Sequence, residues 1–121
     1  AHEPVNPPGP QPAPESLEDL ARQHDRLIGV ILAEEEELIS AHRQHIDMMV
    51  NLVKEEMVFL NNVDQPGSDV DHYVEGLDRI LRQKDDYIVG IRQRLDNFKD
   101  HLRQEELLSK KFTSLSSSSS A

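Results

Sequence analysis

Two long stretches of the chain carry apolar residues at helical spacing. In the first, they are Leu20, Leu27, Ile28, Ile31, Ile39, Ile46, Met49, Val53, Met57 and Leu60. In the second, steps of four and three alternate through Val70, Val74, Leu77, Leu81, Lys84, Ile88, Ile91, Leu95, Phe98 and Leu102. Only Lys84 interrupts this second row, which is a heptad pattern. No stretch sustains a period of two, so the sequence predicts two long helices and no sheet.

The helix boundaries follow from capping and breaking residues. Ser16 and Ser68 are good N-caps, and an acidic residue follows each of them three positions later. Between the two rows, Pro66 forbids a continuous helix and Gly67 supplies a turn. We therefore expect helices over 17–62 and 69–111, joined by a turn over 63–68. The turn-forming residues are predicted to be Asp64, Pro66, Gly67 and Ser68.

Two helices of similar length with a short connection favour an all-α fold, a long antiparallel helical hairpin. Folding the chain back at the turn places Ile39 opposite Ile91 and Val53 opposite Leu77. It also brings the acidic run 34–37 beside the basic residues Arg92, Arg94 and Lys99. This match of charges favours the hairpin over separate parallel helices.

Such a hairpin has a thin core and leaves apolar residues uncovered. On the first helix, this uncovered flank is predicted to be Leu38, Met48, Val50, Leu52, Val58 and Phe59. We expect it to be covered by a second copy, in a two-fold homodimer that forms a four-helix bundle, or by a protein partner. The candidate interface residues are Ile46, Met48, Met49, Val53, Met57, Phe59, Leu60, Tyr73, Leu77, Leu81, Ile88 and Ile91.

The two ends of the chain differ from its middle in composition. Residues 1–15 hold all but one of the seven prolines and are predicted to form an extended, disordered linker. The predicted hairpin domain covers 16–112. Residues 113–121 are mostly serine and are predicted to be a disordered tail.

Charge and composition exclude several function classes. The formal net charge of −10 argues against a nucleic-acid partner. Cysteine is absent, and no long apolar run suggests a membrane span. Phosphate-binding glycine motifs are absent too, so we expect no cofactor and no catalytic residues. His42 and His45 share a helix face, but zinc would need further ligands, so we expect no metal site.

The residues from about 34 to 111 resemble a known family. Four segments carry the resemblance: E-E-E-E-L-I-S-A-H-R (34–43), V-D-Q-P-G-S-D-V-D-H-Y-V (63–74), L-D-R-I-L-R-Q-K (77–84) and L-D-N-F-K-D-H-L-R-Q-E-E-L-L-S-K-K (95–111). They are similar to the C-terminal tail of the internal-motor, microtubule-depolymerising kinesins of the kinesin-thirteen family. The turn around Pro66 and Gly67 is the most specific of these segments.

The resemblance implies a fragment without the ATPase motor. We expect a non-catalytic interaction module that dimerises or docks a helical adaptor. A tail that folds back on its own motor or neck, and a structural coiled-coil protein unrelated to kinesins, are the alternatives. The resemblance also implies a cytoplasmic location on microtubules, at the spindle, centrosome, cilium or cortex.

Overall fold

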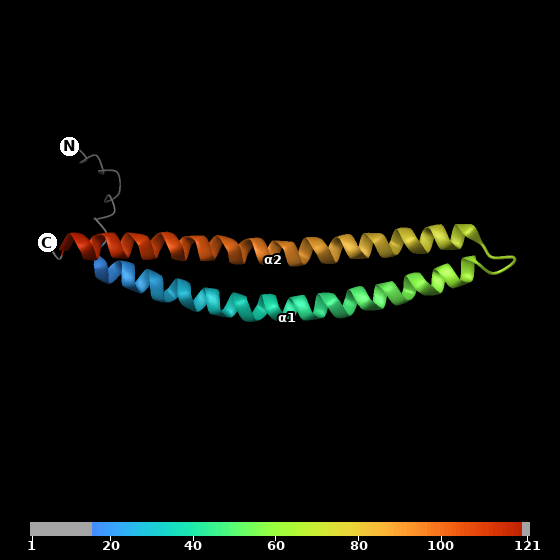
Figure 1. Ribbon diagram of the computed structural model, residues 1–121, viewed down its shortest axis with the longest axis horizontal. Coiled ribbons are helices and arrows are strands. Elements are labelled where there is room, and N and C mark those ends of the chain that lie inside the picture. Colours follow the sequence, from blue (N-terminus) through green and yellow to red (C-terminus); the bar gives the residue numbers. More distant parts are fainter. Residues whose placement is uncertain (1–15, 120–121) are drawn as a thin grey trace, which may run out of the picture.

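The computed structural model describes residues 16–119, and it confirms the predicted all-α antiparallel hairpin. Helix α1 (Leu17–Val63) and helix α2 (Val70–Ser119) lie side by side along their length, with the turn at one end (Figure 1). The first residue of α1 and the last residues of α2 therefore lie together at the other end. The predicted linker, residues 1–15, and residues 120–121 of the predicted tail lie outside the described residues.

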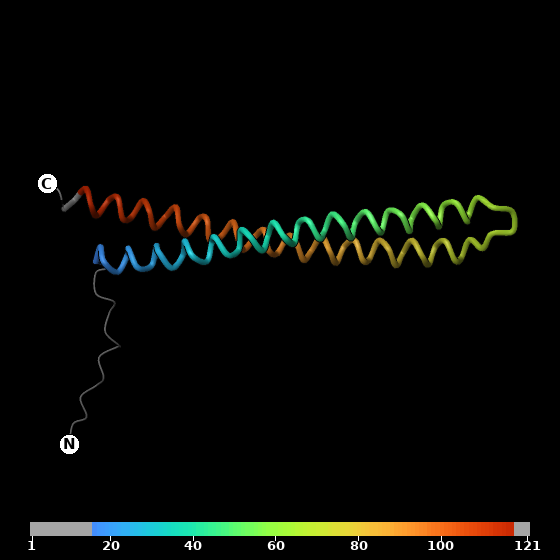
Figure 2. Tube along the Cα trace, turned by 90° about the horizontal axis from the view of Figure 1, so that it is seen from below, coloured from blue at the N-terminus to red at the C-terminus, as the bar shows by residue number. Residues whose placement is uncertain are grey.

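The helices wind around each other rather than running straight. Seen at right angles to the first view, they cross near their middle and separate toward both ends (Figure 2). Helices that keep a seven-residue apolar repeat must supercoil in this way, because the straight α-helix repeats every 3.6 residues. The arrangement is that of a two-stranded coiled coil closed by a turn.

Capping interactions define the start of α1. Ser16 is the N-cap, with an extended backbone, and its hydroxyl oxygen accepts a hydrogen bond from the amide of Asp19 at 3.1 Å. This bond satisfies one of the amides that a helix N-terminus leaves without an intrahelical partner. Asp19 also pairs with Arg22 one turn later, at 3.2 Å.

Ser68, in the turn, does not have the predicted role of N-cap for the second helix. The Ser68 hydroxyl donates to the carbonyl oxygen of Val63 at 2.8 Å, so Ser68 closes α1 and does not cap α2. Asp69 takes the capping role instead, because its carboxylate accepts from the amide of Asp71 at 3.0 Å. Gly67 has a φ of +77°, a value that residues with a side chain rarely adopt.

Helix α2 continues past Lys111, where the sequence predicted its end. It reaches Ser119, through residues with weak helix propensity. In this extension, Phe112 lines a pocket together with Ala21 of α1, and Leu115 is half-buried. At the same end of the hairpin, Leu20, only four residues after the N-cap, is fully buried.

The contacting faces of the two helices coincide with the predicted seam only in part: Leu20 and Ile31 are buried and Leu77 and Ile91 are half-buried as expected, but other seam residues are exposed. We call the facing set the inner interface; its most buried apolar members are Leu20, Ile31, Leu52 and Ile80. The predicted facing residues Val53 and Leu81 are instead about half exposed, at 49% and 47%. Each helix is thus rotated by about one residue relative to the predicted seam.

The same rotation corrects the predicted flank. Leu52 is buried, and Leu38, Met48 and Phe59 are half-buried in the inner interface. Phe59 packs its ring against His72 of α2, with ring centroids 5.3 Å apart. Of the predicted flank, only Val50 and Val58 are exposed.

Candidate interaction surface

Each helix exposes an unbroken row of aliphatic residues, spaced by seven. We call the two rows together the apolar face. Its members are Leu32, Ile39, Ile46, Val53 and Leu60 on α1, and Val74, Leu81, Ile88, Leu95 and Leu102 on α2. Their exposed fractions lie between 42% and 58%. A seven-residue spacing keeps each row on one side of a coiled pair. Each row starts near the turn and covers more than half of its helix, from 32 to 60 on α1 and from 74 to 102 on α2.

The two rows lie on the same side of the hairpin. A groove between the helices is lined by Ile39 from α1 and by Ile88 and Leu95 from α2. His42 and Leu38 line the same groove. Because heptad spacing keeps the other row residues on the same side, the apolar face is one surface, with the groove at its central level, and not two separate stripes on opposite sides. A soluble protein rarely leaves so long an apolar surface uncovered.

The structure divides the predicted interface residues into two groups. Six belong to exposed positions on or beside the apolar face: Ile46, Val53, Met57, Leu60, Leu81 and Ile88. The other six are half-buried: Met48, Met49, Phe59, Tyr73, Leu77 and Ile91. Phe59 and Met48, which were predicted to point away from the hairpin, belong to the inner interface. Leu32, Ile39, Val74, Leu95 and Leu102 complete the apolar face and were missing from the predicted set.

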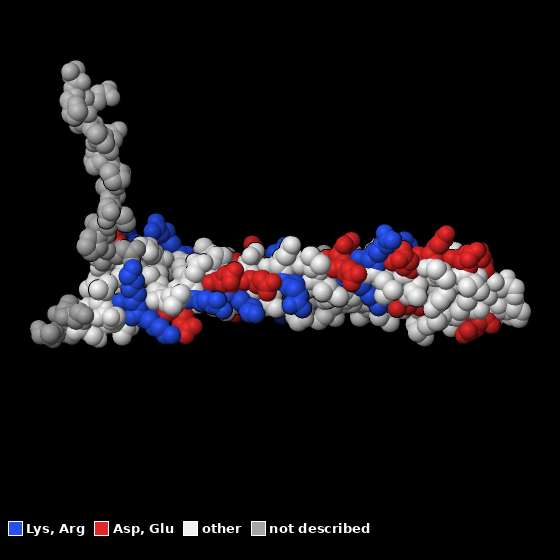
Figure 3. Space-filling model, turned by 90° about the horizontal axis from the view of Figure 1, so that it is seen from above, with Lys and Arg blue, Asp and Glu red and all other residues white. Residues whose placement is uncertain are grey.

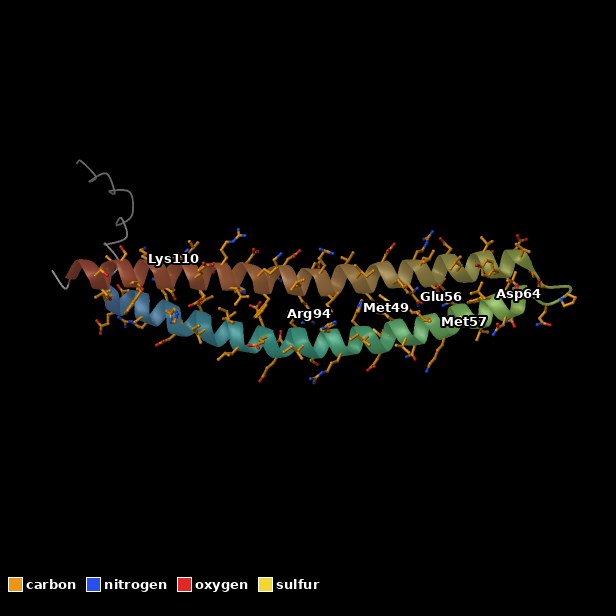
Figure 4. All side chains as sticks on the ribbon, in the orientation of Figure 1. Met49, Glu56, Met57, Asp64, Arg94 and Lys110 are labelled. Atoms are coloured by element: carbon orange, nitrogen blue, oxygen red, sulfur yellow. The ribbon has the colours of Figure 1, made fainter. Side chains whose placement is uncertain are left out.

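Ion pairs between α1 and α2 fix the register of the two helices. Lys84, the polar residue of the second predicted row, pairs with Glu56 of α1, which lies on the side of α1 that faces α2 (Figure 4). Arg79 reaches Glu55 at 3.6 Å, and Arg94 reaches Glu37 at 3.8 Å. The last pair confirms in part the predicted match between the acidic run 34–37 and the basic residues of α2.

Histidine–glutamate pairs join the two helices toward the end of the hairpin opposite the turn, which we call the open end. His24 Nε2 lies 3.1 Å from Glu105 Oε1, and the Ser109 hydroxyl donates to the same oxygen at 2.7 Å. A second pair joins His101 of α2 to Glu34 of α1. The Ser109 hydrogen bond, followed by the contact with His24, holds the pKa of the Glu105 carboxyl below its ordinary value of 4.5.

The lowered pKa of Glu105 predicts an acid-sensitive contribution to stability. The carboxylate stabilises the folded chain fully above pH 4.5, and this contribution is lost as the pH falls through the lowered value. The difference in melting temperature between the native chain and Glu105→Gln should therefore be largest above pH 4.5 and shrink in more acidic buffer. Circular dichroism melts from pH 2 to pH 7 measure it. Glu106→Gln is the matched control, because Glu106 contacts Lys110 on the exposed side of α2. If the melting temperatures of the native chain and Glu105→Gln differ by the same amount at every pH, the pKa of Glu105 is not lowered in the folded chain.

Gly76 allows a close approach between the two helices in the inner interface. A Cβ atom placed on Gly76 would lie 2.3 Å from Cζ of the Phe59 ring, whereas one on Gly90 would meet nothing within 4 Å. Gly76 and Gly90 both interrupt helical patterns, so their positions in the sequence do not distinguish them. The distinguishing signal is the facing aromatic side chain, which only the observed register reveals.

Other chemistry is sparse in the described part of the chain. Across residues 16–119, no cluster of three or more His, Asp or Glu side chains has the arrangement of a metal site, and His42 and His45 are not part of one. Within the same range, neither helix is apolar enough over a long enough stretch to cross a membrane. Charged side chains of both signs alternate along the hairpin, as the view in Figure 3 shows, without one large patch of a single sign.

Comparison with known proteins gives two relatives that match most of the chain. The kinesin-like protein KIN-13A of Oryza sativa subsp. japonica is 45% identical over 87 residues, which is 72% of this chain and 11% of that protein. The kinesin-like protein KIN-13B of Arabidopsis thaliana is 40% identical over 84 residues, which is 69% of this chain and 12% of that protein. The chain thus spans about a ninth of the length of these relatives. No protein-family profile and no solved structure matches it.

Proposed function

We propose that this chain, which is related to the kinesin-thirteen family as its sequence predicted, is a non-catalytic interaction module of a microtubule-depolymerising kinesin. It associates with another helical surface through the apolar face. Motor activity and ATP hydrolysis would reside elsewhere in the parent protein, which acts on microtubules in the cytoplasm.

The continuity of the apolar face carries this proposal. Ten aliphatic residues at two fixed heptad positions are half exposed, while the inner interface of the same hairpin contains His24, Glu34 and Lys84. A lone hairpin would gain by placing its aliphatic residues inward, where burial stabilises by roughly 25 cal/mol per Å². An aliphatic row that faces solvent at heptad spacing along two helices is typical of a surface that docks other helices.

Substituting a central residue of the apolar face tests the proposal. In the parent kinesin, Ile88→Asp should abolish association through this module, because a carboxylate would have to be desolvated in the middle of the groove. We expect at least about a hundredfold loss of affinity, since 3 kcal/mol corresponds to more than two factors of ten. Association is measured by sedimentation, and localisation by fluorescence microscopy of the tagged protein.

Val89→Asp is the matched control for this experiment. Val89 adjoins Ile88 in sequence and is 55% exposed, but it lies outside the apolar face. It should leave association and localisation unchanged. Circular dichroism should show that both variants keep their helices. If the Ile88→Asp kinesin associates and localises like the native protein while its helices are intact, the module does not act through this face.

A further inference from the structure

We propose that Ser68, in the turn, is a phosphorylation site for a protein kinase that recognises acidic residues, and that its phosphate opens the turn end of the hairpin. This inference goes beyond the proposed function, because it concerns a covalent modification of the turn and not the docking of a helix. The phosphate donor is ATP. The Ser68 hydroxyl oxygen forms a bond to the γ-phosphorus, the bond from that phosphorus to the β–γ bridging oxygen breaks, ADP leaves, and the hydroxyl proton passes to a base of the kinase.

The position of Ser68 makes it available to an enzyme. Of the serine and threonine residues between 16 and 119, only Ser16 and Ser68 lie outside the two helices. Kinases bind the segment around the acceptor in an extended form, so a residue inside a helix must first unfold. Residues 69–72 are all exposed, with Val70 at 59%, and the start of α2 can therefore unwind without uncovering the inner interface.

The residues that follow Ser68 are acidic. Asp69 and Asp71 occupy the first and third positions after it, and no Lys or Arg occurs between Lys54 and Arg79. A substrate groove lined with Lys and Arg binds such a segment well, because carboxylates form charge-assisted hydrogen bonds with these cations. The serines near the other end of α2 have no acidic residue after them. The charge pattern therefore selects the turn rather than the end of α2.

Ser16 shares the acidic context of Ser68 but differs in the consequence of a phosphate. Glu18 and Asp19 follow Ser16, whose hydroxyl accepts from the amide of Asp19 at the N-terminus of α1. A negative charge is stabilised at that end of a helix, so a phosphate on Ser16 would leave the hairpin closed. The Ser68 hydroxyl contacts the C-terminus of α1 instead, where the same charge is unfavourable.

Phosphorylation removes the hydrogen bond by which Ser68 closes α1. The hydroxyl donates to the carbonyl oxygen of Val63 at 2.8 Å, whereas a phosphoester oxygen carries no hydrogen to donate. The carbonyls of the last turn also carry the partial negative charge of the helix C-terminus. A phosphate with a charge of about −1.5 to −2 at pH 7 is therefore repelled by the group that the hydroxyl bound.

No cation of the turn balances the added charge. Asp64 directly follows α1 (Figure 4), and on the side seen in Figure 3 the turn end shows acidic side chains but no basic ones. The basic residue that comes first after the turn, Arg79, already contacts Glu55 at 3.6 Å. At the start of α2, the carboxylate of Asp69 already accepts from the amide of Asp71. Repulsion among the phosphate and these carboxylates thus separates the ends of the two helices.

The opening acts on contacts beside the turn. The ring of Phe59 packs against His72 there, and Leu60 and Val74 are the members of the apolar face closest to the turn in sequence. Separation of the helix ends breaks the first contact and moves the two row residues apart. Phosphorylation would therefore shorten the apolar face from its turn end, while the His24–Glu105 pair holds the open end.

Labelling by an acidophilic kinase tests the site. The chain with Ser16→Ala is incubated with ATP and purified casein kinase 2, and tandem mass spectrometry locates the phosphate. We expect it on Ser68. Asp71→Asn should slow the labelling at least about tenfold, because a charge-assisted hydrogen bond to the kinase is lost.

Asp64→Asn is the matched control for recognition. It removes the same charge from the turn but on the other side of Ser68, so labelling should stay within about twofold of the native rate. A chain that is not labelled at Ser68, or that is labelled equally fast with Asp71→Asn, would overturn the assignment of the site.

Melting temperatures test the effect of the phosphate. Ser68→Ala loses only the hydrogen bond to Val63 and should melt about 4 °C lower than the native chain. The chain phosphorylated at Ser68 loses the same bond and gains the repulsion, so it should melt lower still. In about 1 M NaCl, its melting temperature should approach that of Ser68→Ala, because salt screens the charges. A phosphorylated chain that melts at or above the native temperature would show that the phosphate caps α2, which overturns the opening of the turn.

Amide hydrogen exchange locates the opening. In the phosphorylated chain, exchange should become faster in the last turn of α1 and in the first turn of α2, and stay unchanged around His24. Ser68→Ala provides the comparison, because it lacks the hydrogen bond without adding charge. Faster exchange at the open end, with the turn end unchanged, would contradict the proposed effect.

Discussion

Replacing Ile80 by Asp should unfold the hairpin. Ile80 is fully buried, with 0% of its surface exposed, and it lies on the face of α2 that contacts α1. Removing a buried Ile side chain costs about 2–5 kcal/mol, and a buried carboxylate without a partner adds a penalty of about 3–5 kcal/mol. The sum rivals the total stability of a small domain, about 5–15 kcal/mol. Loss of the helical circular dichroism signal at 25 °C measures the effect.

Val89→Asp is the control for this substitution too. It introduces the same charge into the same helix, at a position that is 55% exposed and away from both the inner interface and the apolar face. We expect its free energy of unfolding to stay within about 0.5 kcal/mol of the native value. Protein concentration must be equal in all samples, because association raises apparent stability. A helical, cooperatively melting Ile80→Asp variant would show that the inner interface is misassigned.

Gly76→Val should destabilise the hairpin by about 2 kcal/mol, although Val is a better helix former than Gly. The new Cβ would lie 2.3 Å from the Phe59 ring, and the branched methyl groups would extend further into it. The ring also packs against His72, so moving it aside would give up that contact. Overpacking of this kind costs about 1–3 kcal/mol, more than the few tenths gained in helix propensity. Urea unfolding gives the difference.

Gly90→Val separates the packing effect from the helix effect. Gly90 lies in the same helix, and an added Cβ there meets nothing within 4 Å. Only the gain in helix propensity remains, so this variant should be as stable as the native chain or more stable by up to about 0.5 kcal/mol. Equal destabilisation by both substitutions would mean that Phe59 does not constrain Gly76.

Hydrophobic spacing predicted the two helices and their antiparallel pairing but identified only part of the contacting faces, since Leu77, Ile91 and Phe98 are half-buried as expected. The second row, from Val70 to Leu102, is the cleanest heptad pattern in the chain, and it was taken as the hairpin seam. In the structure, Val74, Leu81 and Ile88 face solvent instead. The inner interface is a neighbouring row that mixes Ile80 and Tyr87 with His101 and the close approach at Gly76.

This partial mismatch has a physical explanation. A search for apolar periodicity selects the positions with the most aliphatic residues, and the predicted seam therefore combined the apolar face with one half of the inner interface. Polar pairs such as Lys84 with Glu56 and His24 with Glu105 hold the inner interface together. Such pairs form only when the two residues face each other across the interface. The pattern within one helix does not show which residue of the other helix it faces. The turn was easier to predict, because Pro66 and Gly67 act locally: Gly67 has the positive φ that its lack of a side chain permits.

The short connection between the helices has a consequence for how the chain folds. Contacts near the turn, such as Phe59 with His72, join residues close in sequence, whereas His24 and Glu105 are 81 residues apart. Closing a long loop costs more entropy than closing a short one, so pairing begins beside the turn and advances toward the open end. Substitutions around Phe59 and Gly76 then act mainly on the folding rate, while those around His24 act mainly on the unfolding rate. We therefore expect the hairpin to close from the turn outward, and the end opposite the turn to be the first part to open.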